Sequence, residues 1–110
     1  MYTYSANVIS IKDGDTIVVD IDLGFGILLK QQIIRLSKIN APELKSSLAG
    51  GISKDKLSSL ILGKKIKLIT EKDKKEKYGR WLGTIYLNES NKDLNINELL
   101  VSEGFAKNIK

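Results

Sequence analysis

The sequence predicts a mainly β domain with helices (class α+β), arranged as a five-stranded Greek-key barrel with two packed helices. Three observations lead to this prediction. Short runs of β-branched residues alternate with turn residues, which is typical of strands. One segment with helical spacing follows the third run, and another follows the fifth. The 110 residues suffice for one core of ordinary size, so we expect residues 1–110 to form a single domain.

The first three strands are predicted at residues 8–11, 16–21 and 27–36. β-Branched residues dominate the first two, and the third is an aliphatic segment with residues 30–32 expected at a bend or an exposed edge. Asp13-Gly14 separates the first two strands and favours a tight turn, because both residues tolerate positive φ. The glycine-flanked segment 24–26 separates the second strand from the third. This connection is long, and we expect it to form a hairpin that extends beyond the barrel.

A loop is predicted at residues 37–44, because the residue before Pro42 is restricted to extended geometry. A helix follows at residues 52–61, where apolar residues recur on one face and Gly63 is placed to end it. Residues 65–69 alternate between polar and apolar, as a half-buried strand does. The charged run 71–77 is predicted to be a solvated, mobile loop.

The fifth strand is predicted at residues 81–87, and a second, short helix over residues 94–105 ends near Gly104. Five short strands with a helix inserted after the third fit a barrel of the OB type. The apolar runs are too short to span a bilayer, and no apolar leader follows Met1. We therefore expect no membrane association and a cytoplasmic protein, or a secreted one if a leader has been removed.

The composition limits the possible chemistry. The chain has no cysteine and no histidine, which excludes disulfides, thiol nucleophiles, zinc fingers and Ser-His-Asp triads. The formal charge of +5 is a mild argument for a polyanionic partner, although lysines that merely hydrate the surface explain it more simply. The only arginines are Arg35 and Arg80, which favours sites that need a planar fork for carboxylate or phosphate. A structural ion pair explains them equally well.

Three segments carry polar residues that a barrel core does not require, and each segment alone also has a simpler structural explanation. Residues 13–16 fit a hairpin turn, but a turn does not require Asp15. Residues 35–43 carry an arginine, an amide and a carboxylate, and they fit a loop with one surface ion pair. Residues 77–83 fit a turn followed by an aromatic residue that plugs the barrel.

Taken together, these segments and one from the second helix match a known pattern in order and spacing. They read Asp-Gly-Asp-Thr at 13–16, Arg-Leu and Asn-Ala-Pro-Glu within 35–43, Lys-Tyr-Gly-Arg at 77–80, and Asn-Glu-Leu-Leu-Val with Gly-Phe-Ala within 97–106. On these motifs the chain resembles the staphylococcal nuclease (thermonuclease) family over nearly its whole length. Each motif is loose by itself, but the ordered set is specific.

The resemblance implies a calcium site. The metal-binding aspartate of the family corresponds to Asp15, and a backbone carbonyl ligand corresponds to that of Ala41. The family commonly has a second aspartate where this chain has Asn40. An amide oxygen still suits Ca²⁺, but one formal charge is missing, so we expect weaker calcium binding than in a site with two aspartates.

The resemblance also implies catalytic and substrate-binding residues. The two arginines that contact the scissile phosphate correspond to Arg35 and Arg80, and the carboxylate that activates or positions water corresponds to Glu43. Lys77 and Tyr78 correspond to residues that hold the nucleotide. These roles are physically coherent, because phosphodiester hydrolysis builds negative charge that fixed cations stabilise.

The predicted function is therefore that of a calcium-dependent endonuclease that hydrolyses DNA and RNA with low sequence specificity and leaves 3′-phosphates. The expected partners are single-stranded or flexible DNA and RNA, and the expected state is a monomer. One alternative is a non-catalytic or weakly active OB-fold module that only binds nucleic acid. The other is an interaction domain with no polyanionic ligand.

Overall fold

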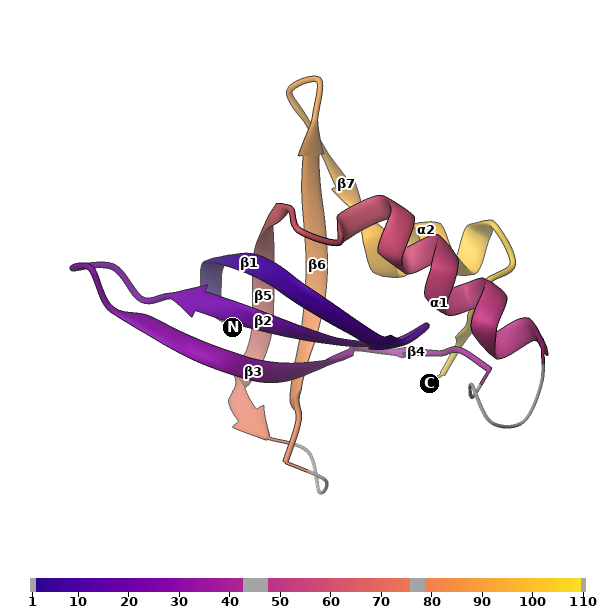
Figure 1. Cartoon of the computed structure of the whole chain (residues 1–110), viewed down its shortest axis with the longest axis horizontal. Coiled ribbons are helices and arrows are strands. Elements are labelled where there is room, and N and C mark those ends of the chain that lie inside the picture. Colours follow the sequence, from indigo (N-terminus) through magenta and orange to yellow (C-terminus); the bar gives the residue numbers. More distant parts are fainter. Residues whose placement is uncertain (1, 43–47, 76–78, 110) are drawn as a thin grey trace.

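The computed structural model describes residues 2–42, 48–75 and 79–109, and it confirms the mainly β barrel (Figure 1). Antiparallel pairs give the strand order β3-β2-β1-β5-β6, and a parallel pair between β3 and β6 closes the barrel. The strands of this wall are β1 (Tyr2–Asp13), β2 (Thr16–Asp22), β3 (Leu28–Leu36), β5 (Lys65–Lys75) and β6 (Trp81–Glu89).

Two helices accompany the barrel, as predicted: α1 (Leu48–Ile61) precedes β5, and α2 (Ile96–Ser102) follows the last long hairpin. Gly63 and Gly104 have φ of 74° and 84°, the left-handed conformation that ends a helix and favours glycine. Within the described residues, neither helix has the length and apolar character needed to cross a membrane.

Three short strands were not predicted. β7 (Lys92–Asn95) extends β6 as a hairpin, and β4 (Ile39–Asn40) pairs with β8 (Lys107–Asn108) in a separate two-stranded sheet. Strands of two to four residues are too short for an alternating pattern to reveal them. The β4–β8 sheet is important for the site, because it joins the segment after β3 to the C-terminal end of the described chain.

The prediction of a solvated loop at residues 71–77 is wrong for most of its length. β5 continues to Lys75, where it pairs with Trp81 of β6 after an irregularity in the register. The backbone hydrogen bonds of a sheet do not depend on apolar side chains, so a charged run continues a strand when a neighbouring strand supplies its partners. Residues 76–78 lie outside the described residues.

The turn between β1 and β2 is where it was predicted, but the predicted reason for its glycine is wrong. Asp13 pairs with Thr16, so the turn residues are Gly14 and Asp15, and Gly14 is not among the residues with positive φ. A Cβ on Gly14 would lie 2.7 Å from the Cβ of Ser53 and 2.8 Å from the Cβ of Ala41. Glycine is therefore required here for space rather than for backbone conformation.

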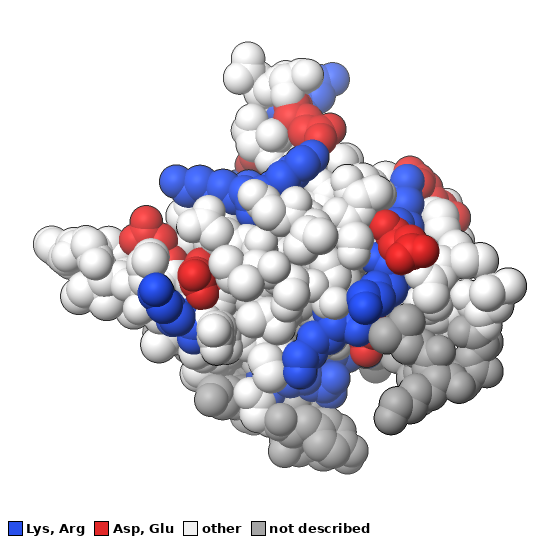
Figure 2. Space-filling model, viewed as in Figure 1, with Lys and Arg blue, Asp and Glu red and all other residues white. Residues whose placement is uncertain are grey.

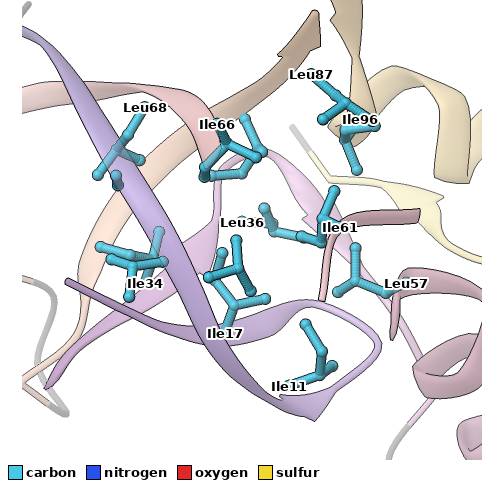
Figure 3. Close-up of a cluster of buried hydrophobic side chains, with 14 of the residues drawn as sticks. Ile11, Ile17, Ile34, Leu36, Leu57, Ile61, Ile66, Leu68, Leu87 and Ile96 are labelled. Carbon is cyan, nitrogen blue, oxygen red and sulfur yellow. The ribbon is translucent and has the colours of Figure 1, made fainter. Parts of the chain in front are cut away.

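The core fills the barrel and the space beneath the helices (Figure 3). Ile17 and Ile34 come from the barrel wall, Leu57 and Ile61 from α1, and Ile96 from α2, and each is fully buried. Burial of each such side chain contributes on the order of 2 kcal/mol. The core thus fixes α1 against the barrel, and α1 in turn packs against the β1–β2 turn.

Candidate functional site

Arg35 is the centre of the candidate site. Its Nη2 lies 3.3 Å from Oδ2 of Asp15 and donates to Oδ1 of Asn40 at 3.2 Å, while its Nη1 donates to the carbonyl of Leu36 at 2.9 Å. The Arg35 and Asp15 side chains are only 13% and 9% exposed. Because β2 and β3 pair with Thr16 opposite Arg35, the turn that carries Asp15 lies beside the end of β3.

Asp15 is held by several hydrogen bonds. Its Oδ2 accepts from the backbone N–H of Ala41 at 2.8 Å, and its Oδ1 accepts from the hydroxyl of Thr16 at 3.0 Å. Its own N–H donates to Oδ1 of Asp13 at 3.1 Å, and its carbonyl accepts from the N–H of Leu36 at 2.8 Å. A carboxylate with this many partners has one orientation, which faces the segment after β3.

The two aspartates of the turn differ in acidity. Burial, together with the hydrogen bond to the Asp13 side chain, raises the pKa of Asp15 above its ordinary value, and the opposing effects of Ala41 and Arg35 are smaller. For Asp13, burial also acts to raise the pKa, but hydrogen bonds with Asp15 and Thr16, together with the charge of Arg35, outweigh it and the pKa is lowered. Such a pair of unlike carboxylates is typical of functional sites.

Contacts with the β1–β2 turn, which packs against α1, position the segment that contains Asn40 and Ala41. The close approach of Gly14 to Ala41 and Ser53 lets the turn fit between this segment and the helix. Ser53 also donates from its hydroxyl to the carbonyl of Phe105 at 2.7 Å, which links α1 to the chain before β8. β8 then pairs Lys107 with Asn40. Three parts of the sequence thus hold the site in place.

Arg80 lies next to the strand that closes the barrel. It is half-buried and immediately precedes β6, whose Leu82 is the register partner of Arg35 in the parallel pair. Two residues of extended chain span about 7 Å, so the backbones of the two arginines are close neighbours across this pair. The structure thus brings Asp15, Arg35, Asn40 and Ala41 into direct contact and places Arg80 just before the adjacent strand.

Glu43, Lys77 and Tyr78, the remaining residues expected at the site, lie outside the described residues. Residues 42 and 48 bound the segment that contains Glu43, and residues 75 and 79 bound the segment that contains Lys77 and Tyr78. Their assigned roles remain predictions from the motifs.

Asp13 and Asn97 fall within the matched motifs, but neither was predicted to support the structure around the site. Asp13 was attributed to the turn alone, but it supports the backbone of Asp15 and lowers its own pKa in doing so. Asn97 is 4% exposed at the start of α2, where it donates to the carbonyls of Ser37 and Gly83 and accepts from the N–H of Ile85. The sequence signal for this role of Asn97 was a polar residue among the apolar residues of the predicted helix.

The chain matches the sequence model of the staphylococcal nuclease homologue family over residues 33–110, which includes Arg35, Asn40 and Arg80. This match covers well over half of the chain.

The chain belongs to the staphylococcal nuclease homologue family.

It is also similar to a protein of Methanocaldococcus jannaschii whose name is "Uncharacterized protein MJ1439", with 32% identity over 127 aligned residues. The alignment covers 94% of this chain and 58% of that relative, so the chain spans little more than half of the relative's length.

The donor atoms of this staphylococcal nuclease homologue suit a hard cation. Oδ2 of Asp15 and Oδ1 of Asn40 both lie within about 3.3 Å of one Arg35 nitrogen, so the two oxygens face the same small volume. Oxygen-only ligation is what Ca²⁺ prefers. Among the described residues no three carboxylates gather, so the protein charge that these residues offer to a cation is low.

Proposed function

We propose that this staphylococcal nuclease homologue is a calcium-dependent endonuclease that hydrolyses phosphodiester bonds of DNA and RNA with low sequence specificity. The observation that supports the proposal best is the contact of Arg35 with Asp15 and Asn40 at the end of β3, beside the strand that begins after Arg80. This arrangement combines oxygen ligands for a cation with guanidinium groups for a phosphate. Membership of the family also supports a nuclease-like role.

Asp15, Asn40 and the Ala41 carbonyl are the proposed ligands of Ca²⁺, which when bound would stabilise negative charge on the phosphate. Arg35 currently shares the Asp15 carboxylate, so a cation and the guanidinium would compete for the same oxygen. The raised pKa of Asp15 adds a second competitor, the proton. Together with the amide at Asn40, these features support weak calcium binding.

Arg35 and Arg80 are the proposed phosphate ligands. A guanidinium fork binds two phosphate oxygens at once, and its charge does not depend on pH in the physiological range. In the proposed reaction water adds to phosphorus, the bond to the leaving oxygen breaks, and the proton lost by the water ends on solvent or on the leaving oxygen. Glu43 is proposed to orient this water or accept its proton.

The charge on the surface supports a polyanionic substrate. Figure 2 shows basic side chains in a band across the face that carries α1 and β1. Contacts from such residues go to phosphates, which every sequence shares, so low sequence specificity follows.

A non-catalytic nucleic-acid-binding module is the second candidate, and one observation favours it. Asp15 is only 6% exposed, and its two oxygens already accept from Ala41 and Thr16 and contact Arg35. A carboxylate satisfied within the protein has less to gain from a cation. In this alternative the arginines bind phosphates without hydrolysis.

End-labelled single-stranded DNA and RNA, incubated with calcium or with a chelator, separate the two candidates. The nuclease proposal expects cleavage that requires metal and falls at least about a hundredfold in Arg35→Lys, because lysine keeps the charge but loses the fork. Glu43→Gln and Arg80→Lys test the other two roles, and Lys92→Ala, an exposed lysine on β7, is the control. Retention of nucleic acid without scission in any divalent metal would favour the binding module.

A further inference from the structure

The hairpin between β2 and β3 projects beyond the barrel (Figure 1). Its tip carries exposed apolar side chains. Phe25 lies at the tip and is 102% exposed. Exposed aliphatic side chains surround it on both strands: Leu23, Ile27, Leu28 and Leu29, at 43, 54, 46 and 39%. A fully exposed phenylalanine within such a cluster marks an interaction surface rather than a scattered apolar residue.

The same hairpin borders an apolar pocket at its base. The pocket opens at the end of the barrel, has a volume of about 210 Å³ and is lined by Tyr4, Ile21, Leu23, Leu29, Thr70 and Trp81. An apolar cavity of about 150 Å³ accommodates benzene, so this pocket is large enough for one phenyl ring. The chain thus carries both an exposed phenylalanine and an apolar pocket large enough for a phenyl ring, and the two are a few residues apart.

We propose that two copies of this chain associate through their β2–β3 hairpins, with Phe25 of each copy inserted into the barrel-end pocket of the other. Two hairpins that cross in opposite directions place each tip over the base of the other. Both contacts then form at once and are related by a two-fold axis, which is the usual symmetry of a homodimer. This association goes beyond the proposed nuclease function and is independent of it, and it replaces the monomer expected from the sequence.

Hydrogen bonds within the hairpin fix the conformation of its tip. The carboxylate of Asp22 accepts from the N–H of Gly24 at 2.8 Å, and that of Asp20 accepts from the N–H of Gln31 at 2.9 Å. Leu23 also donates to the carbonyl of Ile27 at 2.9 Å across the loop. A tip that is already ordered loses less conformational entropy on binding.

The charges of the hairpin disfavour the other occupants. Asp20, Asp22 and Lys30 are its only ionisable residues, so residues 20–30 carry a net charge of −1 in a chain of +5. Figure 2 shows the tip of the hairpin free of charged side chains, with acidic and basic groups set back from it. Nucleic acid and anionic lipid would both meet the acidic part of a basic protein. An apolar protein surface is the better match.

The exposed area is consistent with a weak dimer. The five apolar side chains of the hairpin, of which Leu23 and Leu29 also line the pocket, expose roughly 500 Å² per copy, taking about 200 Å² for a fully exposed large side chain. Full burial of these side chains in two copies would remove about 1,000 Å² from solvent, which is near the lower limit for a specific interface, so we expect a weak dimer.

Sedimentation velocity over a concentration series of the full chain tests the proposal. The protein should shift from monomer to dimer, and Phe25→Ser should weaken the association at least about tenfold, because a central buried aromatic dominates such interfaces. Leu48→Ser is the matched control, since Leu48 is 84% exposed at the start of α1, away from the hairpin, and should leave association unchanged. Thermal unfolding of each variant monitors the fold.

A mixing experiment tests the reciprocal geometry. Leu29→Lys places a charge at the rim of the pocket and should also abolish association. A mixture with Phe25→Ser should recover part of it, because one intact Phe25 then meets one intact pocket. A protein that stays monomeric at about 1 mM would overturn the proposal. So would equal weakening by Leu48→Ser, or an effect of Phe25→Ser on binding to single-stranded DNA or anionic vesicles with none on self-association.

Discussion

Gly14 makes a strong test of the packing that supports the site. It is a turn residue with no need for positive φ, and its importance lies in the absence of a side chain. In Gly14→Ala the new Cβ would lie 2.7 Å from the Cβ of Ser53 and 2.8 Å from the Cβ of Ala41. Carbon atoms pack at about 3.5–4.0 Å, so α1 and the segment with Ala41 would each have to move away from the turn by roughly 0.7–1.3 Å.

Both neighbours resist this movement. Ser53 is on a helix anchored in the core by Leu57 and Ile61, and Ala41 donates its N–H to Asp15. Overpacking of this kind costs about 1–3 kcal/mol, and we expect about 2 kcal/mol of lost unfolding free energy for Gly14→Ala. For a domain of this length that corresponds to a melting temperature lower by roughly 10 °C.

Urea and thermal unfolding measure the change, with Gly51→Ala as the matched control. Gly51 lies within α1 and a Cβ there meets nothing within 4 Å, so alanine should stabilise the helix by about 0.5–1 kcal/mol. Gly14→Asn separates space from backbone conformation, because asparagine tolerates positive φ better than alanine but is larger. Asparagine should therefore be the worse substitution. A Gly14→Ala protein as stable as the wild type, or Asn tolerated better than Ala, would refute the reasoning.

Three further predictions concern the site. Because the pKa of Asp15 is raised, the folded state binds its proton more tightly than the unfolded state, and this residue's contribution to stability falls as the pH rises through that pKa. Asp15→Asn should therefore raise the unfolding free energy at neutral pH, measured by urea titration, and should abolish calcium binding. A loss of stability would show that the contact with Arg35 outweighs the cost of burial. Asn97→Ala removes hydrogen bonds to Ser37, Gly83 and Ile85 and should cost about 3 kcal/mol in the same assay, whereas a cost below about 1 kcal/mol would contradict the buried network. Asn40→Asp should lower the calcium concentration for half-maximal activity severalfold, and an unchanged value would count against Asn40 as a ligand.

The strands and helices with strong patterns were predictable from the sequence for local reasons. β2 was found from its β-branched residues, β3 from an aliphatic segment that follows a glycine-flanked turn, and α1 from its apolar face. The ends of both helices followed from Gly63 and Gly104, because few other residues adopt the conformation required there. The charged end of β5 and the short strands β4 and β8 were not predictable, since their backbone partners come from distant parts of the chain.

Part of the candidate site could be predicted as a set of residues, but its geometry could not. The motifs identified Asp15, Arg35, Asn40 and Ala41, and the structure brings all four into contact. The motifs did not indicate that Arg35 contacts both Asp15 and Asn40, nor that Asp15 is buried enough for its pKa to rise. These properties depend on distances between residues far apart in sequence, which spacing along the chain does not encode.

The sequence by itself determined the family, the barrel of five strands with two helices, and the residue types available for chemistry, because these depend on local periodicity and on motifs in order. Only the tertiary structure decided why Gly14 must be glycine, which groups share the carboxylate of Asp15, and that the hairpin with Phe25 at its tip also borders an apolar pocket. Close packing and burial arise when distant segments meet, and a contact or a shift in pKa exists only once they have met.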